Sequence, residues 1–263
     1  MKIVEEFHEF TWDMIRSLPM CYYNYKNNIP QKLRCKPGLS DVYYFVNNIE
    51  ELDRFDAFNN NISYTHAPPF YTMYEWEPPP LKEHYLNKEK LEFDKPTVVI
   101  QNKFSLEWNS GPFNYFSEEF LDTLFALLQD KYEIIYIRPT GDDEKYYKDE
   151  NEILEFGDYK LIQDKYPNIH TIDKFLNMYP NYSYNIVQCL LEATSDKHIA
   201  VSGGNACIAA YFGGDVLVYD SPLGQGAGRG IWKTGSWLSK LGGAQIYGFN
   251  KYEDILSMIE ERW

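Results

Sequence analysis

Long hydrophobic segments are missing from this sequence of 263 residues. Nowhere do about 18 uncharged apolar residues follow one another, which is roughly the length that a transmembrane helix needs. The first ten residues, MKIVEEFHEF, are acidic and lack the apolar centre of a secretory signal peptide. We therefore expect neither a membrane span nor a secretion signal, and we predict a cytoplasmic protein.

Cysteine is scarce, and its spacing forms no metal or disulfide pattern. The sequence has four cysteines: Cys21, Cys35, Cys189 and Cys207. They are too far apart for a zinc motif, and too few for the disulfide scaffold of a small secreted domain. No histidines occur at ligand spacing, and the D-x-D triplet that would hold a divalent ion on a sugar diphosphate is also absent. We expect a reducing compartment, no bound metal and no cofactor.

Positively charged residues are few: the sequence has 25 Lys and Arg against 39 Asp and Glu, which gives a net charge of −14. The overall field of such a protein disfavours binding to nucleic acid or to an anionic membrane. The hydrophobic fraction of 44% permits a real core, and the length allows one large or two modest domains. Oligomeric state is not indicated by any pattern in the sequence.

Proline divides the chain into two parts. Residues 68–80 contain five prolines among aromatic residues, and proline blocks both helices and central strands. We interpret this stretch as a crossing between a small N-terminal α/β domain, residues 1–80, and a Rossmann-like domain, residues 81–263, that ends in a helix over 252–263. In the first domain we expect strands over 1–10, 20–25, 42–46 and 62–65, and helices over 11–18 and 49–58.

After residue 95 short apolar strands alternate with helices. The expected strands are 97–100, 133–137, 169–172, 199–201, 216–219 and 246–249, and the clearest helices are 117–131 and 184–193. This alternation predicts a parallel sheet covered by helices on both faces. Ligands of such sheets bind at the carboxyl ends of the strands, where the strand order reverses.

A glycine turn follows the strand at 199–201. Gly203, Gly204 and Asn205 lead into a compact apolar helix, so that free backbone N–H groups and the positive end of the helix dipole would face a ligand. The turn predicts an anion site, although two glycines are also what a tight strand-to-helix corner requires. Neither a G-x-G-x-x-G fingerprint nor an intact P-loop is present.

Polar residues follow the other expected strands of the second domain. Lys103 and Arg138 bring positive charge to the binding edge, where they would hold a diphosphate together with the helix N-terminus. Each of them, taken alone, is also explained as a cation that pairs with a nearby acid. Further candidates at the same edge are Glu107, Asp220 and Ser221.

The first domain supplies candidates for a general base. His8 or Glu9, at the end of the first strand, would take a proton from an acceptor hydroxyl. Thr11 and Asp13 follow, but residues of these types commonly begin a helix, and we favour that interpretation for Asp13. Asp41 and His66, at later strand ends, are weaker candidates for a position in the cleft.

The second domain resembles the donor-binding half of a GT-B glycosyltransferase. The resemblance is carried by PTVVIQNK at 96–103, IIYIRP at 134–139 and VSGGNACIAAYFGGDVLVY at 201–219, and it extends over about residues 95–249. It is strongest to small glycosyltransferase-like proteins of a little-characterised family that share this order of motifs. The resemblance implies two facing Rossmann-like domains, with the nucleotide sugar bound to the second and the acceptor presented by the first.

The resemblance also implies roles for individual residues. The Gly203-Gly204-Asn205 turn would touch the diphosphate, Lys103 and Arg138 would neutralise it, and no metal would be needed. We therefore predict a glycosyltransferase that moves a sugar from a nucleoside diphosphate sugar to a glycan or another hydroxyl acceptor. Two alternatives stay open: a nucleotide-sugar epimerase of the related two-domain fold, and a non-catalytic module that binds a glycan or a protein partner.

Overall fold

The structure is a computed structural model, and it describes residues 2–5, 10–52, 75–106, 111–140, 152–223 and 230–263. Its larger sheet has six parallel strands in the order β6-β5-β4-β7-β8-β9. These are β4 (Thr97–Gln101), β5 (Glu133–Ile137), β6 (His170–Thr171), β7 (Lys197–Val201), β8 (Asp215–Tyr219) and β9 (Gln245–Phe249). The predicted parallel sheet is confirmed, and its order reverses between the neighbours β4 and β7.

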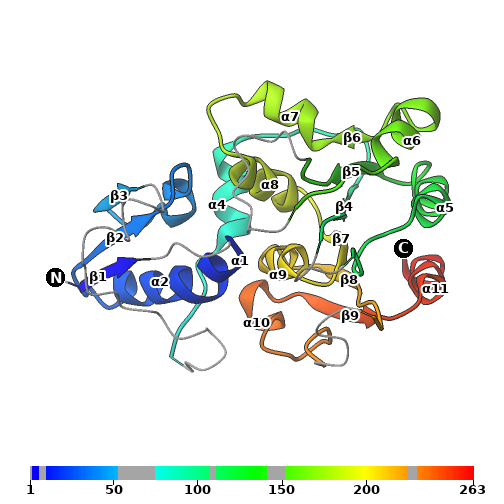
Figure 1. Cartoon of the computed structure of the whole chain (residues 1–263). Helices are drawn as coiled ribbons and strands as arrows, with labels where there is room; N and C mark the ends of the chain where they lie inside the picture. Colours follow the sequence, from blue (N-terminus) through cyan, green and yellow to red (C-terminus); the bar gives the residue numbers. More distant parts are fainter. Residues whose placement is uncertain (1, 6–9, 53–74, 107–110, 141–151, 224–229) are drawn as a thin grey trace.

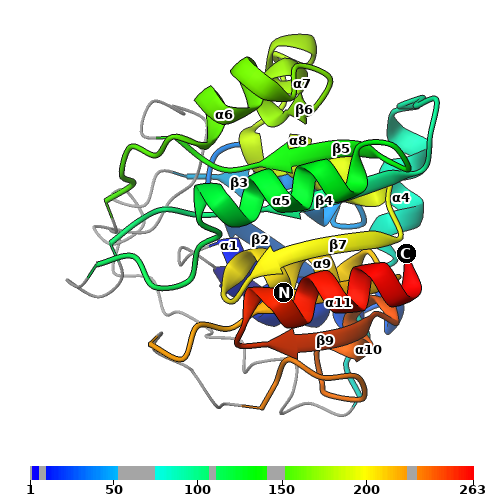
Figure 2. The same ribbon diagram turned by 90° about the vertical axis from the view of Figure 1, so that its right-hand side faces the viewer.

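Helices cover both faces of this sheet, as the alternation of elements predicts (Figure 1). They are α4 (Leu81–Lys88), α5 (Glu118–Leu128), α6 (Asp158–Lys165), α7 (Ile172–Met178), α8 (Tyr184–Ala193), α9 (Gly204–Tyr211), α10 (Ser239–Gly242) and α11 (Tyr252–Arg262). Figure 2 shows α5 and α11 against one face of the sheet. Helices α7, α8 and α9 pack on the opposite face, so buried strand residues point alternately to the two sides.

The N-terminal part has a smaller parallel sheet in the order β1-β2-β3. Its strands are β1 (Lys2–Glu5), β2 (Gln31–Cys35) and β3 (Ile49–Glu51). Between β1 and β2 the chain forms α1 (Phe10–Trp12), a π-helical turn (Asp13–Ser17) and α2 (Leu18–Lys26), and a 3-10 turn (Ser40–Tyr43) follows β2. The chain is therefore α/β throughout, with helices on two parallel sheets.

Several expectations for the first part were wrong. Residues 20–25 lie in α2 rather than in a strand, because Pro19 occupies the first turn of that helix, where the missing N–H has no intrahelical partner to lose. Residues 42–46 contain the end of a 3-10 turn, and residues 49–51 form β3 instead of a helix. The strand expected at 62–65 lies outside the described residues.

The two parts share one hydrophobic core. A single cluster of buried side chains runs from Val4 and Leu33 in the small sheet to Tyr211 of α9 and Ile246 of the larger sheet. The Tyr211 hydroxyl donates a hydrogen bond to the backbone oxygen of Met14, and α1 packs against α9 (Figure 1). Helix α4 follows the proline-rich stretch, of which only residues 75–80 are described; the domain boundary at residue 80 stays a prediction. None of the helices in the described ranges is long and apolar enough to cross a membrane.

Candidate functional site

The glycine turn between β7 and α9 needs both of its glycines, for different reasons. Gly203 has φ +132° and ψ −151°, a conformation that residues with a Cβ rarely adopt. Gly204 has an ordinary φ, but a Cβ there would lie 2.2 Å from the Thr11 hydroxyl oxygen. The turn therefore brings the backbone at the start of α9 into close contact with the N-terminal part of the chain.

Lys103 extends over this turn from the end of β4. Its ammonium nitrogen lies 3.3 Å from the position that a Cβ on Gly203 would take. The N-terminus of α9 carries the positive end of the helix dipole. Lys103 and the start of α9 thus place two sources of positive charge close together at this turn.

Asn102 holds this arrangement together. Its side-chain oxygen accepts hydrogen bonds from the backbone N–H of Lys103 (2.9 Å) and of Phe116 (2.8 Å). Its amide group donates to the Phe116 oxygen (3.2 Å) and to the Tyr136 hydroxyl (3.1 Å), while Asn205 donates to the Asn102 backbone oxygen at 3.4 Å. Asn102 is fully buried, so these contacts fix the position from which Lys103 extends.

Arg138 lies at the end of β5, the strand next to β4, but its guanidinium group has a carboxylate partner. It is 2% exposed and forms two hydrogen bonds with the fully buried Asp158 of α6, one of them 2.7 Å long from Nη2 to Oδ1. The Tyr136 hydroxyl donates to the same carboxylate. Burial lowers the pKa of Arg138, but its hydrogen bond and ion pair with Asp158 raise it more. Its role as a ligand of a diphosphate stays a prediction.

Thr11 of the N-terminal part contacts the glycine turn. His8 and Glu9, the predicted general bases, lie outside the described residues. Asp13 is fully buried in the π-helical turn and accepts a hydrogen bond from the Tyr43 hydroxyl (2.7 Å). Burial, and then the charge of Asp13, raise the pKa of Tyr43. A π-helical turn is frequent at functional sites, and sequence reasoning missed it because Asp13 and its neighbours fit an ordinary helix start.

Among the described residues, the structure does not bring the other predicted site residues together at one site. Glu107 and His66 fall outside the described residues. Asp41 forms an ion pair with Lys88 of α4 at 2.8 Å, which links the two parts of the chain. Ser221 is 3% exposed, and its backbone N–H, just beyond the end of β8, donates a hydrogen bond to Asn114 Oδ1 (3.0 Å). Asp220 lines a cavity beside it.

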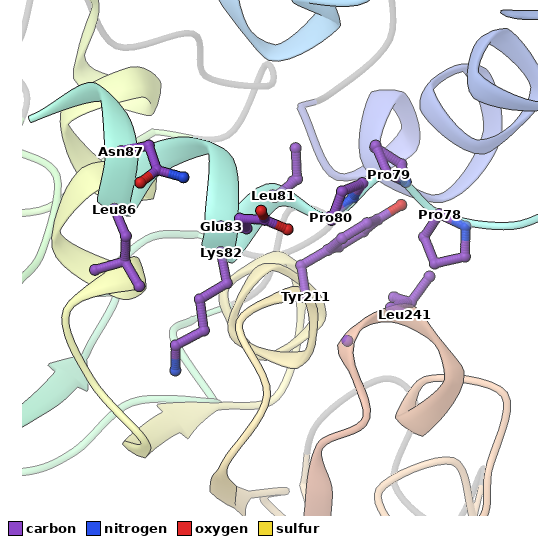
Figure 3. Close-up of a pocket in the computed structure, with 11 residues that line it drawn as sticks. Pro78, Pro79, Pro80, Leu81, Lys82, Glu83, Leu86, Asn87, Tyr211 and Leu241 are labelled. Atoms are coloured by element: carbon purple, nitrogen blue, oxygen red, sulfur yellow. The ribbon is translucent and has the colours of Figure 1, made fainter. Parts of the chain in front are cut away.

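Two cavities accompany these residues. One, of about 560 Å³, lies at the far end of α9, between residues 78–80, Tyr211 and Leu241. Figure 3 shows these side chains converging there, with Lys82 directed away from them. The other, of about 490 Å³, lies at the carboxyl ends of β8 and β9, the same edge of the sheet as the glycine turn. Across the described ranges, no three His, Cys, Asp or Glu side chains are grouped to hold a metal ion.

Comparisons with known proteins identify the fold. No protein-family model matches the sequence, and no curated protein does. Among solved structures, the Escherichia coli heptosyltransferase WaaC with ADP-2-deoxy-2-fluoro heptose has a TM-score of 0.57 at 11% identity, and the match covers 100% of both chains. The glycosyl transferase family 9 protein from Veillonella parvula has a TM-score of 0.53 at 9% identity, with 99% of this chain and 89% of that one covered. The expected GT-B fold is confirmed, whereas membership of the small family is not shown.

Proposed function

We propose that this protein is a glycosyltransferase that uses a nucleoside diphosphate sugar as donor. The proposal is carried by the ammonium group of Lys103 at the positive end of α9, within a fold that resembles two glycosyltransferase structures. In a protein with a net charge of −14, such a local concentration of positive charge suits an anionic group of the substrate. A diphosphate has the charge and the oxygen atoms to accept from both the lysine and the backbone N–H groups.

The same groups would assist the chemical step. When the glycosidic bond to the donor breaks, negative charge grows on the leaving diphosphate, and donors already in place stabilise it most in the transition state. Lys103 and the start of α9 are held by the Asn102 hydrogen bonds, so little reorganisation is required. We propose that this positive charge replaces the divalent ion that other transferases place on the diphosphate, consistent with the lack of a D-x-D triplet.

The acceptor hydroxyl needs a group that takes its proton. We propose His8 or Glu9 for this role, as the sequence predicts, because the described segment that follows them brings Thr11 onto the glycine turn. Asp13 lies on the same segment, but it is fully buried and accepts from the Tyr43 hydroxyl, so we keep it in a structural role. The acceptor would be a glycan or another hydroxyl compound whose reacting hydroxyl lies on the N-terminal side.

Binding of the donor product tests the proposal directly. The affinities of UDP, GDP, ADP, CDP and dTDP, and of pyrophosphate, are measured by calorimetry for the wild type and for Lys103→Ala. We expect Lys103→Ala to bind the preferred diphosphate about 10- to 100-fold more weakly, the usual effect of losing a charge-assisted hydrogen bond. Lys131→Ala, an exposed lysine in the turn before β5, is the matched control and should bind normally.

Four outcomes would contradict the proposal. The first is a wild type that binds none of the diphosphates, and the second is binding to Lys103→Ala as tight as to Lys131→Ala. A sugar nucleotide that is isomerised without any acceptor would instead identify an epimerase. Binding of glycans without any nucleotide binding would identify the non-catalytic module.

A further inference from the structure

The cavity at the carboxyl ends of β8 and β9 has the chemistry of a carbohydrate site. It has a volume of about 490 Å³, and its lining residues include two aromatic residues, two acidic residues and an asparagine. These are Trp232, Phe249, Asp220, Asp254 and Asn250. An apolar wall with a few polar groups is the usual construction of a small-molecule site.

The polar groups of this cavity select against an anion. No Lys or Arg is found among its described lining residues, whereas Asp220 and Asp254 both carry carboxylates. One carboxylate oxygen of Asp220 is buried and has no hydrogen-bond partner within the described part of the chain. A buried acceptor without a donor is destabilising, so a ligand that donates hydrogen bonds is favoured there.

The aromatic wall is held in place by the edge of the sheet. Lys233 pairs with Tyr247 of β9 as an antiparallel bridge, and the Thr234 hydroxyl both accepts from the backbone N–H of Ile246 (3.0 Å) and donates to its oxygen (3.1 Å). A Cβ on Gly248 would lie 2.6 Å from the backbone oxygen of Trp232, so glycine permits this close approach. The backbone of Trp232 is therefore held close to β9.

The cavity adjoins the glycine turn. The backbone N–H of Ser202, the residue before Gly203, donates to the Tyr219 oxygen at 2.7 Å. The next residue of that strand end, Asp220, donates its own N–H to the Phe249 oxygen, also at 2.7 Å. Backbone hydrogen bonds between the ends of neighbouring strands thus connect the turn, with its positive charge, to the cavity, with its two carboxylates.

We propose that this cavity binds a neutral saccharide ring of the acceptor, an inference that rests on the proposed transferase function. A sugar ring presents apolar C–H groups on its faces, which pack against aromatic rings, and hydroxyl groups at its edge, which donate to carboxylates. The carboxylates repel the diphosphate of the donor, which is attracted to Lys103 instead. Charge thus separates the acceptor from the donor along one edge of the sheet.

The experiment measures saccharide binding and nucleotide binding separately. The probes are glucose, galactose, mannose, N-acetylglucosamine, maltose and lactose, followed by saturation-transfer NMR, and the preferred nucleoside diphosphate, followed by calorimetry. Asp220→Asn preserves shape and removes the charge, and Trp232→Ala removes the aromatic wall. Asp164→Asn, at an exposed position in α6, is the matched control, and circular dichroism verifies that each variant is folded.

We expect at least one saccharide to bind the wild type, and about tenfold weaker binding to Asp220→Asn and Trp232→Ala, with unchanged nucleotide binding. Lys103→Ala should show the reverse pattern. The inference is overturned if no probe binds, if both cavity variants bind saccharides as Asp164→Asn does, or if they lose nucleotide binding instead. Stronger competition by the diamine putrescine than by any sugar would also overturn it. Saccharide binding that depends on Asp220 in a protein that binds no nucleotide would refute the transferase function alone.

Discussion

Replacement of Arg138 by methionine separates a structural role of this residue from a role in donor binding. Arg138→Met keeps much of the aliphatic volume and removes the guanidinium group. In the folded protein that group lies against Asp158, which is itself 0% exposed and also accepts from the Tyr136 hydroxyl. Arg138→Met leaves this carboxylate buried with only part of its hydrogen bonding. We therefore expect a marked loss of stability.

The magnitude follows from the geometry of the pair. Removing one partner of a buried ion pair destabilises a protein by about 3–5 kcal/mol, because the remaining charge is desolvated without compensation. The hydroxyl of Tyr136 and the backbone N–H of Tyr159, 2.9 Å from Asp158 Oδ1, still donate to the carboxylate. We therefore expect the lower end, about 3 kcal/mol, which is a large fraction of the roughly 5–15 kcal/mol that keeps a domain folded.

Urea denaturation followed by circular dichroism gives the free energy of unfolding for this comparison. Lys165→Met is the matched control, because Lys165 forms an ion pair with Asp122 at 2.5 Å in which both side chains are exposed to solvent. Surface pairs of this kind contribute little, so the control should unfold almost as the wild type does. If Arg138→Met unfolds like the control and instead binds pyrophosphate weakly, the structural reasoning is refuted and the predicted diphosphate contact is supported.

Two further predictions concern the glycine turn and a buried carboxyl. Gly204→Ala should destabilise the protein by about 1–3 kcal/mol, because the added Cβ would clash with the Thr11 hydroxyl. Adding Thr11→Ala to the same chain should restore most of the lost free energy of unfolding, as measured by urea denaturation. A double variant as unstable as Gly204→Ala alone would contradict the contact. Burial raises the pKa of Glu192 above 4.5, although His198, 2.8 Å away, opposes this. The folded state therefore holds this proton more tightly, and its contribution to stability is present below about pH 4.5 and lost as pH rises through the raised pKa. Glu192→Gln should flatten that decline above pH 4.5, whereas the exposed Glu260→Gln should not.

The larger sheet could be predicted from the sequence because its strands are buried on both faces. Such strands are short continuous apolar runs, as in residues 97–100 and 216–219, and glycine or polar residues mark their ends. The N-terminal part has no such regularity. Residues 20–25 are rich in tyrosine and have the composition of a strand, yet packing of Met20 and Cys21 into the shared core makes them helical.

The candidate site was predictable only where neighbouring parallel strands determine it. Because β4 and β7 are adjacent, the residues that follow them, Lys103 and Gly203, must lie close together. The partner of Arg138 was not predictable in this way. Asp158 begins a helix that is reached only after a long charged segment, and its approach to β5 depends on how α6 packs. The contact of Thr11 with Gly204 likewise depends on how the two parts meet.

The distribution of charge along the edge of the larger sheet fits the proposed transfer reaction. A transferase must bind a charged leaving group and a largely neutral acceptor close together, and each must bind at its own position. In this protein the end of β7 combines the dipole of α9 with Lys103, while Asp220 follows β8 and Asp254 lies in the first turn of α11, after β9. An anion placed at the second position meets two carboxylates, so in the proposed function the acidic residues there would direct the diphosphate to the turn. The excess of acidic residues would then also favour discrimination between the two proposed substrates.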